Sequence, residues 1–228
     1  MTVPKKLKLG VLVSGGGSNL QAIIDRIEAG DLNAEITVTI SNKPDAFALV
    51  RCGKHGIPAV VIRHQEFPAR EDFDRRMIDV LQGHGVELVV MAGFMRVLTP
   101  VFLNAFPMRI MNIHPALLPA FPGVHVQQQA IDYGVKFSGC TVHFADDGVD
   151  TGPVIIQAVV PVLPQDTADT LAARILREEH RIYPQAIRFY AEGRLHVSGR
   201  KVFVQDAFHV SEQAVHNPPL TGFQEEKE

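Results

Sequence analysis

Apolar runs and helical patterns alternate along the first half of the chain. The apolar runs, which are typical of buried strands, fall at residues 7–13, 36–40, 58–62, 86–91 and 108–113. Between them, apolar residues recur every three or four positions, which predicts helices at residues 20–30, 45–55 and 69–81. Strands that alternate with helices at this spacing imply a parallel sheet covered by helices on both faces.

The second half of the chain has a different pattern. Residues 124–133 are predicted to be helical, but the apolar runs at 138–144 and 154–162 have only a turn between them, which is typical of a hairpin. A long helix is predicted over residues 167–192, with Thr167 or Asp169 as its N-cap. A further short strand pair is expected around His196 and residues 202–204.

These elements predict an α/β fold with a single domain. Its sheet is mostly parallel, twisted and Rossmann-like, with flanking helices, and a mixed C-terminal half completes it. We place this domain at residues 1–194, with its two halves at about 7–110 and 111–194. Residues 195–228 form a C-terminal extension, which is polar from Asn217 onward and expected to be partly disordered.

Composition and charge exclude several classes of function. Of the 228 residues 46% are hydrophobic, and the net charge of −3 provides no basic field for nucleic acid or an anionic membrane. Cys52 and Cys140 are too few for a disulfide framework or a cysteine-rich zinc site. The ten histidines include no His-Glu-x-x-His pair, so no metal is expected. Residues 1–10 contain no long apolar run, and a cytoplasmic protein is therefore expected.

A glycine-rich loop, Ser-Gly-Gly-Gly-Ser-Asn at residues 14–19, joins the first predicted strand to the first helix. Glycines let a backbone approach an anion, and the free N–H groups of a helix N-terminus point at it. The loop lacks the Lys-Ser/Thr of triphosphate-binding loops, and Leu20 occupies the third glycine position of a dinucleotide fingerprint. A phosphate monoester is therefore the favoured ligand; the alternative is an ordinary turn with Ser18 or Asn19 as N-cap.

Asn112 and His114 stand at the end of the fifth apolar run, just before Pro115. Alternate side chains of a strand point the same way, so the two should share one face. An amide beside an imidazole suits a developing oxyanion, and a carboxylate such as Asp150 turned toward the ring would favour imidazolium. The pattern indicates acyl-type transfer chemistry. His143 either packs within its strand or also faces this site.

Residues 92–98 follow the fourth predicted strand. They form either a connecting loop with core side chains or an apolar slot with exposed main-chain groups, which would suit a flat heteroaromatic ring.

Five segments together closely resemble phosphoribosylglycinamide formyltransferase, the folate-dependent family of de novo purine synthesis. They are residues 14–23, 41–43, 92–96, 112–119 and 150–155. The resemblance runs in order from about Leu7 to Arg194, and it does not extend past Gly193. It implies that 10-formyltetrahydrofolate, as co-substrate, donates its formyl group to the amine of 5-phosphoribosylglycinamide without a metal. The expected partners are these two small molecules, and the sequence leaves a homodimer open.

The resemblance also implies roles for individual residues, and it divides the domain into a phosphate-binding first half and a folate and catalytic second half. The catalytic trio matches Asn112, His114 and Asp150. The substrate phosphate would be cradled by Gly16, Gly17, Ser18, Asn19 and Leu20, while Glu179 would contact the glycinamide substrate. The folate side would be formed by Arg70, Met95, Arg96, Val97, Leu98 and Asn112. Gly16 departs from the family, in which many members have a larger polar residue at this position.

Three alternative functions use parts of the same pattern. A 10-formyltetrahydrofolate hydrolase would share the trio but has no need of a phosphate loop. A methionyl-tRNA formyltransferase would need a basic C-terminal domain for RNA, which this sequence lacks. A module that binds phosphate or folate without catalysis would have no need of all three polar residues. The glycine loop favours the transferase.

Overall fold

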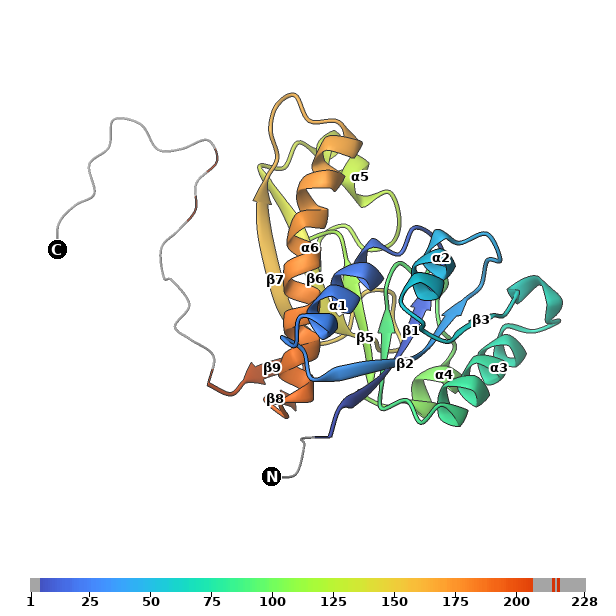
Figure 1. Cartoon of the computed structure of the whole chain (residues 1–228). Helices are drawn as coiled ribbons and strands as arrows, with labels where there is room; N and C mark the ends of the chain where they lie inside the picture. Colours follow the sequence, from blue (N-terminus) through green and yellow to red (C-terminus); the bar gives the residue numbers. More distant parts are fainter. Residues whose placement is uncertain (1–4, 207–214, 216, 218–228) are drawn as a thin grey trace, which may run out of the picture.

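One mixed sheet runs through the molecule, which is described by a computed structural model over residues 5–206, 215 and 217. Within these residues the sheet has nine strands in the order β3-β2-β1-β4-β5-β6-β7-β9-β8 (Figure 1). They are β1 (Leu7–Val13), β2 (Ala34–Ser41), β3 (Ala59–Val61), β4 (Leu88–Met91), β5 (Ile110–His114), β6 (Phe137–Phe144), β7 (Val154–Pro161), β8 (Leu195–Ser198) and β9 (Lys201–Val204). The strands from β3 to β5 are parallel, as the alternating pattern predicts.

Helices cover both faces of this sheet. They are α1 (Ser18–Glu28), α2 (Phe47–Lys54), α3 (Arg70–Gly83), α4 (Pro100–Ala105), α5 (Val126–Tyr133) and α6 (Ala168–Ala191), with a short 3-10 helix η1 (His64–Glu66). Figure 1 shows α1 and α6 side by side in front of the sheet, where they contact each other. Helices α3 and α4 contact each other and pack against the opposite face.

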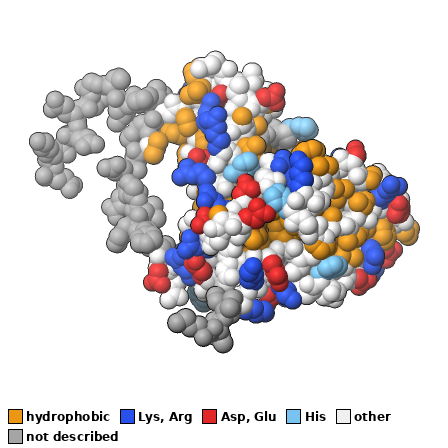
Figure 2. All heavy atoms as spheres, in the orientation of Figure 1, with side chains coloured by type: hydrophobic (Ala, Val, Ile, Leu, Met, Phe, Trp, Pro, Cys, Tyr) orange, Lys and Arg blue, Asp and Glu red, His pale blue; other side chains and the backbone are white. Residues whose placement is uncertain are grey.

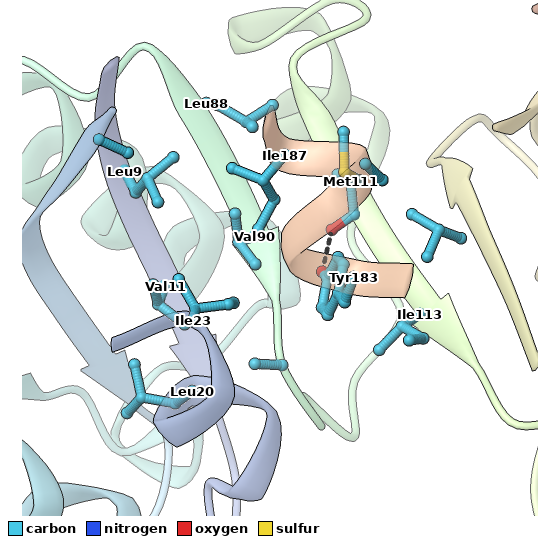
Figure 3. Packing of buried hydrophobic residues seen from close by; sticks show 14 of the residues in the cluster. Leu9, Val11, Leu20, Ile23, Leu88, Val90, Met111, Ile113, Tyr183 and Ile187 are labelled. Atoms are coloured by element: carbon cyan, nitrogen blue, oxygen red, sulfur yellow. Dashed lines mark hydrogen bonds between the residues drawn. The ribbon is translucent and has the colours of Figure 1, made fainter. Parts of the chain in front are cut away.

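Successive residues of the central strands point into different cores. In β1, Val11 and Val13 pack with α1 and α6, whereas Leu12 packs with α3. In β5, Met111 and Ile113 face α6 (Figure 3). Burial on both faces explains why these strands are continuously apolar in the sequence. Because Met111 and Ile113 point toward α6, Asn112 and His114 point together to the other face, as expected.

Helix α6 is capped at its start and hydrogen-bonded to the sheet further along. It begins after Thr167, which forms a reciprocal capping box with Thr170, so the first of the two predicted caps is present. Further along, Tyr183 is completely buried and directs its hydroxyl at two carbonyl oxygens, that of Met91 at 3.1 Å and that of Met111 at 2.8 Å. Figure 3 shows the second of these bonds. One hydroxyl thus joins β4, β5 and α6.

The second half of the sheet is antiparallel except where β7 pairs with β9, and it contains the hairpin that the pattern predicts. Strand β6 pairs antiparallel with both β5 and β7, and β8 pairs antiparallel with β9. Val154 of β7 pairs with Lys201 of β9, so residues 195–204 continue the sheet. The predicted disorder in the tail falls mostly on residues 207–214, 216 and 218–228, which lie outside the described part of the chain.

Some element ends differ from the prediction where the backbone turns left-handed. Strand β5 begins at Ile110 and not at 108, since Met108 has a φ of 53°, and it continues to His114. Helix α5 begins at Val126 because His125 has a φ of 56°. Helix α4 and η1 are too short to show a helical period, and the sequence pattern does not identify them.

Charges of both signs are interspersed on the face formed by α1 and α6 (Figure 2). Several of them are paired within α6, such as Arg181 with Glu178. Among the helices of the described residues, none is long and apolar enough to cross a membrane.

Candidate active site

A cavity of about 650 Å³ lies where β4 and β5 end. The carboxyl ends of strands are where open α/β sheets usually bind ligands. The cavity brings together residues predicted for the folate side and for catalysis, with His143 among them: Met95, Arg96, Val97, Leu98, Asn112, His114, His143 and Asp150. Two groups of residues that lie far apart in the sequence therefore share one concave surface.

The carboxylate of Asp150 is the centre of the polar part of this cavity. Its Oδ2 lies 3.3 Å from Nδ1 of His114 and accepts the N–H of Gly123 at 2.9 Å. Its Oδ1 accepts from the amide Nδ2 of Asn112 at 3.4 Å and lies 3.7 Å from Nε2 of His143. The contact expected between Asp150 and His114 is thus present.

The segment between β6 and β7 folds back over β5 to bring Asp150 to this position. The chain passes so close to β6 at Gly152 that a Cβ there would lie 1.7 Å from the carbonyl oxygen of Phe144, so only glycine fits. Asp146 organises the turn by accepting from the backbone N–H of Gly148 and the hydroxyl of Thr151. Asp147 is exposed. Of the three acids in this turn, only Asp150 contacts the histidine.

Both ring nitrogens of His114 face hydrogen-bond acceptors. Nε2 lies 2.8 Å from the carbonyl oxygen of Phe121, and Nδ1 faces the Asp150 carboxylate. A carbonyl can only accept, so Nε2 carries a proton, and the imidazolium is the form that donates to both partners. For Nε2 to donate to a substrate oxygen, that oxygen would have to replace the carbonyl of Phe121.

His143 supports Asn112 from the neighbouring strand. The two residues are direct partners in the β5–β6 pairing, and Nε2 of His143 lies 3.2 Å from the Asn112 amide nitrogen. Nδ1 of His143 donates to the carbonyl of Phe144, which leaves Nε2 as the acceptor. Burial lowers the pKa of His143, which favours this neutral form. His143 therefore both packs in its strand and faces the site.

Residues 93–98 form one wall of the cavity, which is apolar apart from Arg96. Phe94 and Leu98 are buried, whereas the side chains of Met95 and Val97 are more than half exposed at its mouth. Within the described residues, the backbone groups of Arg96 and Leu98 take part in none of the hydrogen bonds. Arg70 does not line the cavity; its guanidinium instead donates to the carbonyl of Val97 at 2.7 Å.

The glycine loop presents the open end of α1. The N-cap of this helix is Gly17, which has a φ of 68° and makes no side-chain cap, so the alternative of Ser18 or Asn19 as an ordinary cap is wrong. The first intrahelical bond is from Gln21 N–H to Gly17, which leaves the three N–H groups before it, of Ser18, Asn19 and Leu20, without a helical partner. The side chain of Leu20 is fully buried, so only its backbone can reach a ligand.

Helix α2 packs against the glycine loop and fixes its conformation. A Cβ on Gly17 would lie 2.7 Å from the Cβ of Ala48, so this position accepts only glycine. Ala48 donates its N–H to the carbonyl of Gly15, and the guanidinium of Arg51 donates to the carbonyl of Gly16 at 2.9 Å. The loop is therefore shaped by contacts from another helix.

Glu179 of α6 is buried beside the first turn of α1. Its Oε2 accepts from the amide of Asn19 at 2.7 Å. Burial raises the pKa of Glu179, and the hydrogen bond from Asn19 partly opposes this effect. The Oδ1 of Asn19 is buried and has no hydrogen-bond partner among the described residues. Glu179 and Asn19 thus connect α6 to the glycine loop.

The glycine loop and the catalytic trio do not line the same cavity. Gly16, Gly17, Asn19, Leu20 and Glu179 line neither of the two cavities, while Ser18 lines a second cavity of about 370 Å³ between α1, α2 and α6. Arg51 and His180 also line this second cavity.

Sequence reasoning missed Ser14, Arg51 and His125. Ser14 and Arg51 hold the loops around the site through hydrogen bonds, and His125 lines the larger cavity. Neither Arg51 nor His125 belongs to a motif, because each reaches the site only through tertiary packing. Among the described residues, no three side chains of His, Cys, Asp or Glu gather as metal ligands would.

Comparison with known proteins gives a consistent result. A family model described as formyl transferase matches residues 7–187. The phosphoribosylglycinamide formyltransferase of Escherichia coli is 43% identical over 189 residues, which cover 83% of this chain and 89% of that protein. The solved structure of glycinamide ribonucleotide transformylase 1 from Symbiobacterium toebii has a TM-score of 0.87 at 51% identity, covering 88% of this chain and 95% of that one.

Two further comparisons are less complete. The trifunctional purine biosynthetic protein adenosine-3 of Drosophila melanogaster is 47% identical over 195 residues, or 85% of this chain, but these span only 14% of that longer protein. A formyltetrahydrofolate deformylase from Pseudomonas syringae has a TM-score of 0.82 at 26% identity, covering 89% of this chain and 67% of that one.

Proposed function

Because the chain belongs to the formyl transferase family, we propose that it transfers the formyl group of 10-formyltetrahydrofolate to the amine of 5-phosphoribosylglycinamide. The products would be formylglycinamide ribonucleotide and tetrahydrofolate, as in de novo purine synthesis. The proposal is supported by the relatives that are aligned over most of their length, which are named for this activity.

One observation carries the proposal. An amide, an imidazole and a carboxylate, those of Asn112, His114 and Asp150, meet at the edge of an apolar cavity. Donors held in place before the reaction stabilise a developing oxyanion better than water does, because they need no reorganisation. The same cavity has an apolar wall that could hold a ring system, which supports a carbonyl group bound through a flat carrier.

In the proposed reaction the substrate amine adds to the formyl carbon, and the carbonyl oxygen gains negative charge. Asn112 turns one N–H of its amide from its present partners, Asp150 and His143, to this oxygen. His114 donates through Nε2 once the oxygen has replaced the carbonyl of Phe121. Asp150 accepts from Nδ1 of His114, which keeps the ring oriented. As the carbon–nitrogen bond to the folate breaks, the proton lost by the amine is transferred to the folate nitrogen, with Asp150 as the carboxylate that relays it through water.

The two substrates would be held by different parts of the chain. The N–H groups of Ser18, Asn19 and Leu20 make no hydrogen bond to another described residue, and they would bind the phosphate with the positive end of the α1 dipole behind them. Glu179 would contact the ribose or glycinamide part. The pterin ring would lie against residues 95–98, where the unpaired backbone groups of Arg96 and Leu98 offer donors and acceptors. Arg70 would act by supporting this segment.

The alternative is a 10-formyltetrahydrofolate hydrolase on the same scaffold. It is favoured by the similar fold of the Pseudomonas syringae deformylase. Two observations support the transferase instead: the higher identity to the transferases, and the N–H groups of the glycine loop, which no other described residue bonds.

A spectrophotometric assay separates these possibilities. The protein is mixed with a 10-formyl folate, with and without phosphoribosylglycinamide, and release of the deformylated folate is followed. Release that depends on the amine supports the transferase. Release without the amine identifies a hydrolase, and no release in either case identifies a binding protein.

Two further proposals concern the cellular location and the oligomeric state of the protein. We propose a cytoplasmic location, which is supported by Cys52 and Cys140 being free and buried. A homodimer is tested by light scattering of the purified chain, where a single species at twice the 25.1 kDa chain mass would support it.

A further inference from the structure

Residues 95–99 are held by three side chains from other parts of the chain. Each of these side chains bonds one backbone group, on residues 95, 97 and 99 in turn. The hydroxyl of Ser14 accepts from Met95 N–H at 2.9 Å. The guanidinium of Arg70 donates to the carbonyl of Val97, and the carboxylate of Asp74 accepts from Thr99 N–H at 2.7 Å. Arg70 and Asp74 both belong to α3. Ser14 is different, because it belongs to the start of the glycine loop.

Ser14 joins the ends of three neighbouring strands. It follows β1, which lies between β2 and β4 in the sheet (Figure 1). Its N–H donates to the carbonyl of Gly93 at 3.1 Å, after β4, and its hydroxyl donates to Oδ1 of Asn42 at 2.7 Å, after β2. Ser14 and Asn42 are both buried, so water does not readily replace these bonds.

Ser14 lies between the two segments that are proposed to bind the substrates. Residues 15–19 continue from it into the loop proposed for the phosphate, and residues 95–98 form the slot proposed for the pterin. Ser14 is therefore a direct connection between the two substrate sites, which otherwise line different surfaces. Reacting atoms must be held in register, and a displacement of about 1 Å can cost roughly 100-fold in rate.

We propose that Ser14 is a positioning residue that fixes the pterin slot relative to the glycine loop. This inference rests on the proposed transfer reaction. Without the hydroxyl, Met95 N–H and Asn42 Oδ1 lose their partner. Residues 95–99 then keep the bonds from Arg70 and Asp74 of α3, and the backbone bond from Ser14 to Gly93 holds the chain only before the slot. The slot would then bind the folate less tightly and present its formyl carbon less accurately to the amine.

The test compares Ser14→Ala with Ser138→Ala in the full chain. Ser138 is a matched control, because it is also buried but its hydroxyl makes no hydrogen bond to another described residue. Steady-state kinetics are measured at a temperature where both variants are folded. Ser14→Ala is expected to raise the KM for 10-formyltetrahydrofolate about tenfold and to lower kcat, as expected for a lost positioning contact. Ser138→Ala should stay within about twofold of the wild type.

Equal kinetic constants for Ser14→Ala and the wild type would overturn the proposal, and so would a fall in kcat with an unchanged folate KM. If Ser14→Ala does not fold, Ser14→Cys decides, because a thiol is a weak donor and acceptor in nearly the same place. It should raise the folate KM by a smaller factor, and an unchanged value rejects the proposal. If the wild type itself transfers no formyl group, the proposed function fails, and binding of a 10-formyl folate analogue to the same variants still tests Ser14.

Discussion

Oδ2 of Asp150 lies 3.3 Å from Nδ1 of His114, and the other oxygen of the same carboxylate accepts from Asn112. The three side chains therefore form one connected group in which each orients the next. The carboxylate reaches this place because the chain passes close to the end of β6 at Gly152, where only glycine fits. Changes at any of the three should affect turnover more than stability.

Replacement of His114 by alanine should lower kcat by about 10²–10³-fold, since it removes a donor to the developing oxyanion. The measurement is steady-state turnover with both substrates saturating. His196→Ala is the matched control, because His196 is exposed in β8 and does not line the cavity. Near-normal turnover of His114→Ala would contradict its catalytic assignment.

Replacement of Gly17 by valine should mainly weaken binding of the phosphorylated substrate. The position has a φ of 68° and no room for a Cβ, so the loop must shift and its N–H groups lose their common direction. The KM for phosphoribosylglycinamide should rise at least about tenfold, the factor that corresponds to 1.4 kcal/mol. Gly53→Ala, in α2 with open space around it, is the control. A loss of folate affinity alone would mean that the loop has another ligand.

Replacement of Tyr183 by phenylalanine should destabilise the fold by about 1–3 kcal/mol, because it leaves buried carbonyl oxygens without their donor. The hydroxyl donates to the carbonyl oxygens of Met91 and Met111, and Figure 3 shows the bond to Met111. Urea unfolding measures the change. Tyr190→Phe removes a hydroxyl that has no hydrogen bond among the described residues, and it should have a smaller effect. Equal stabilities of the two variants would show that the hydrogen bonds from Tyr183 to Met91 and Met111 do not stabilise the fold.

The buried Glu179 should make stability depend on pH. Burial raises its pKa above the ordinary 4.5, so the folded chain keeps the proton to a higher pH than the unfolded chain does. Between 4.5 and the raised pKa, the folded state binds more protons, and its stability therefore falls as pH rises. In Glu179→Gln this fall should be smaller, whereas the neighbouring Glu178→Gln should keep the wild-type slope. The free energy of unfolding is measured by urea titration at several pH values. If stability falls with pH in Glu179→Gln as steeply as in the wild type, or more steeply, Glu179 is not the source of the pH dependence.

Most of the fold could be predicted because its signals are local. Both faces of the central strands are buried, so Val11, Leu12 and Val13 are all apolar and identify β1 directly. The antiparallel half was predicted from the single turn between β6 and β7. The ends of elements were less accurate, since they depend on single backbone conformations such as those of Met108 and His125, which have no strong sequence signal.

Only the site residues that belong to sequence motifs could be predicted. Asn112 and His114 share a face by simple alternation, and Asp150 was identified through the family resemblance. The roles of Ser14 and Arg51 could not be predicted in the same way, because their hydrogen bonds join residues that are far apart in the chain. Arg70 was expected on the folate side, and the structure places its guanidinium against the backbone of Val97 and outside the cavity.

The exchange of Asp150 for asparagine tests whether this carboxylate acts on His114 during formyl transfer. The variant keeps the size of the side chain but removes the charge beside His114, and Asp147→Asn makes the same change at an exposed position of the same turn. The kcat of Asp150→Asn should fall by at least about 100-fold, as expected for a lost electrostatic and proton-transfer group. Asp147→Asn should remain close to the wild type. Equal kcat values for Asp150→Asn and the wild type would contradict the proposed chemistry.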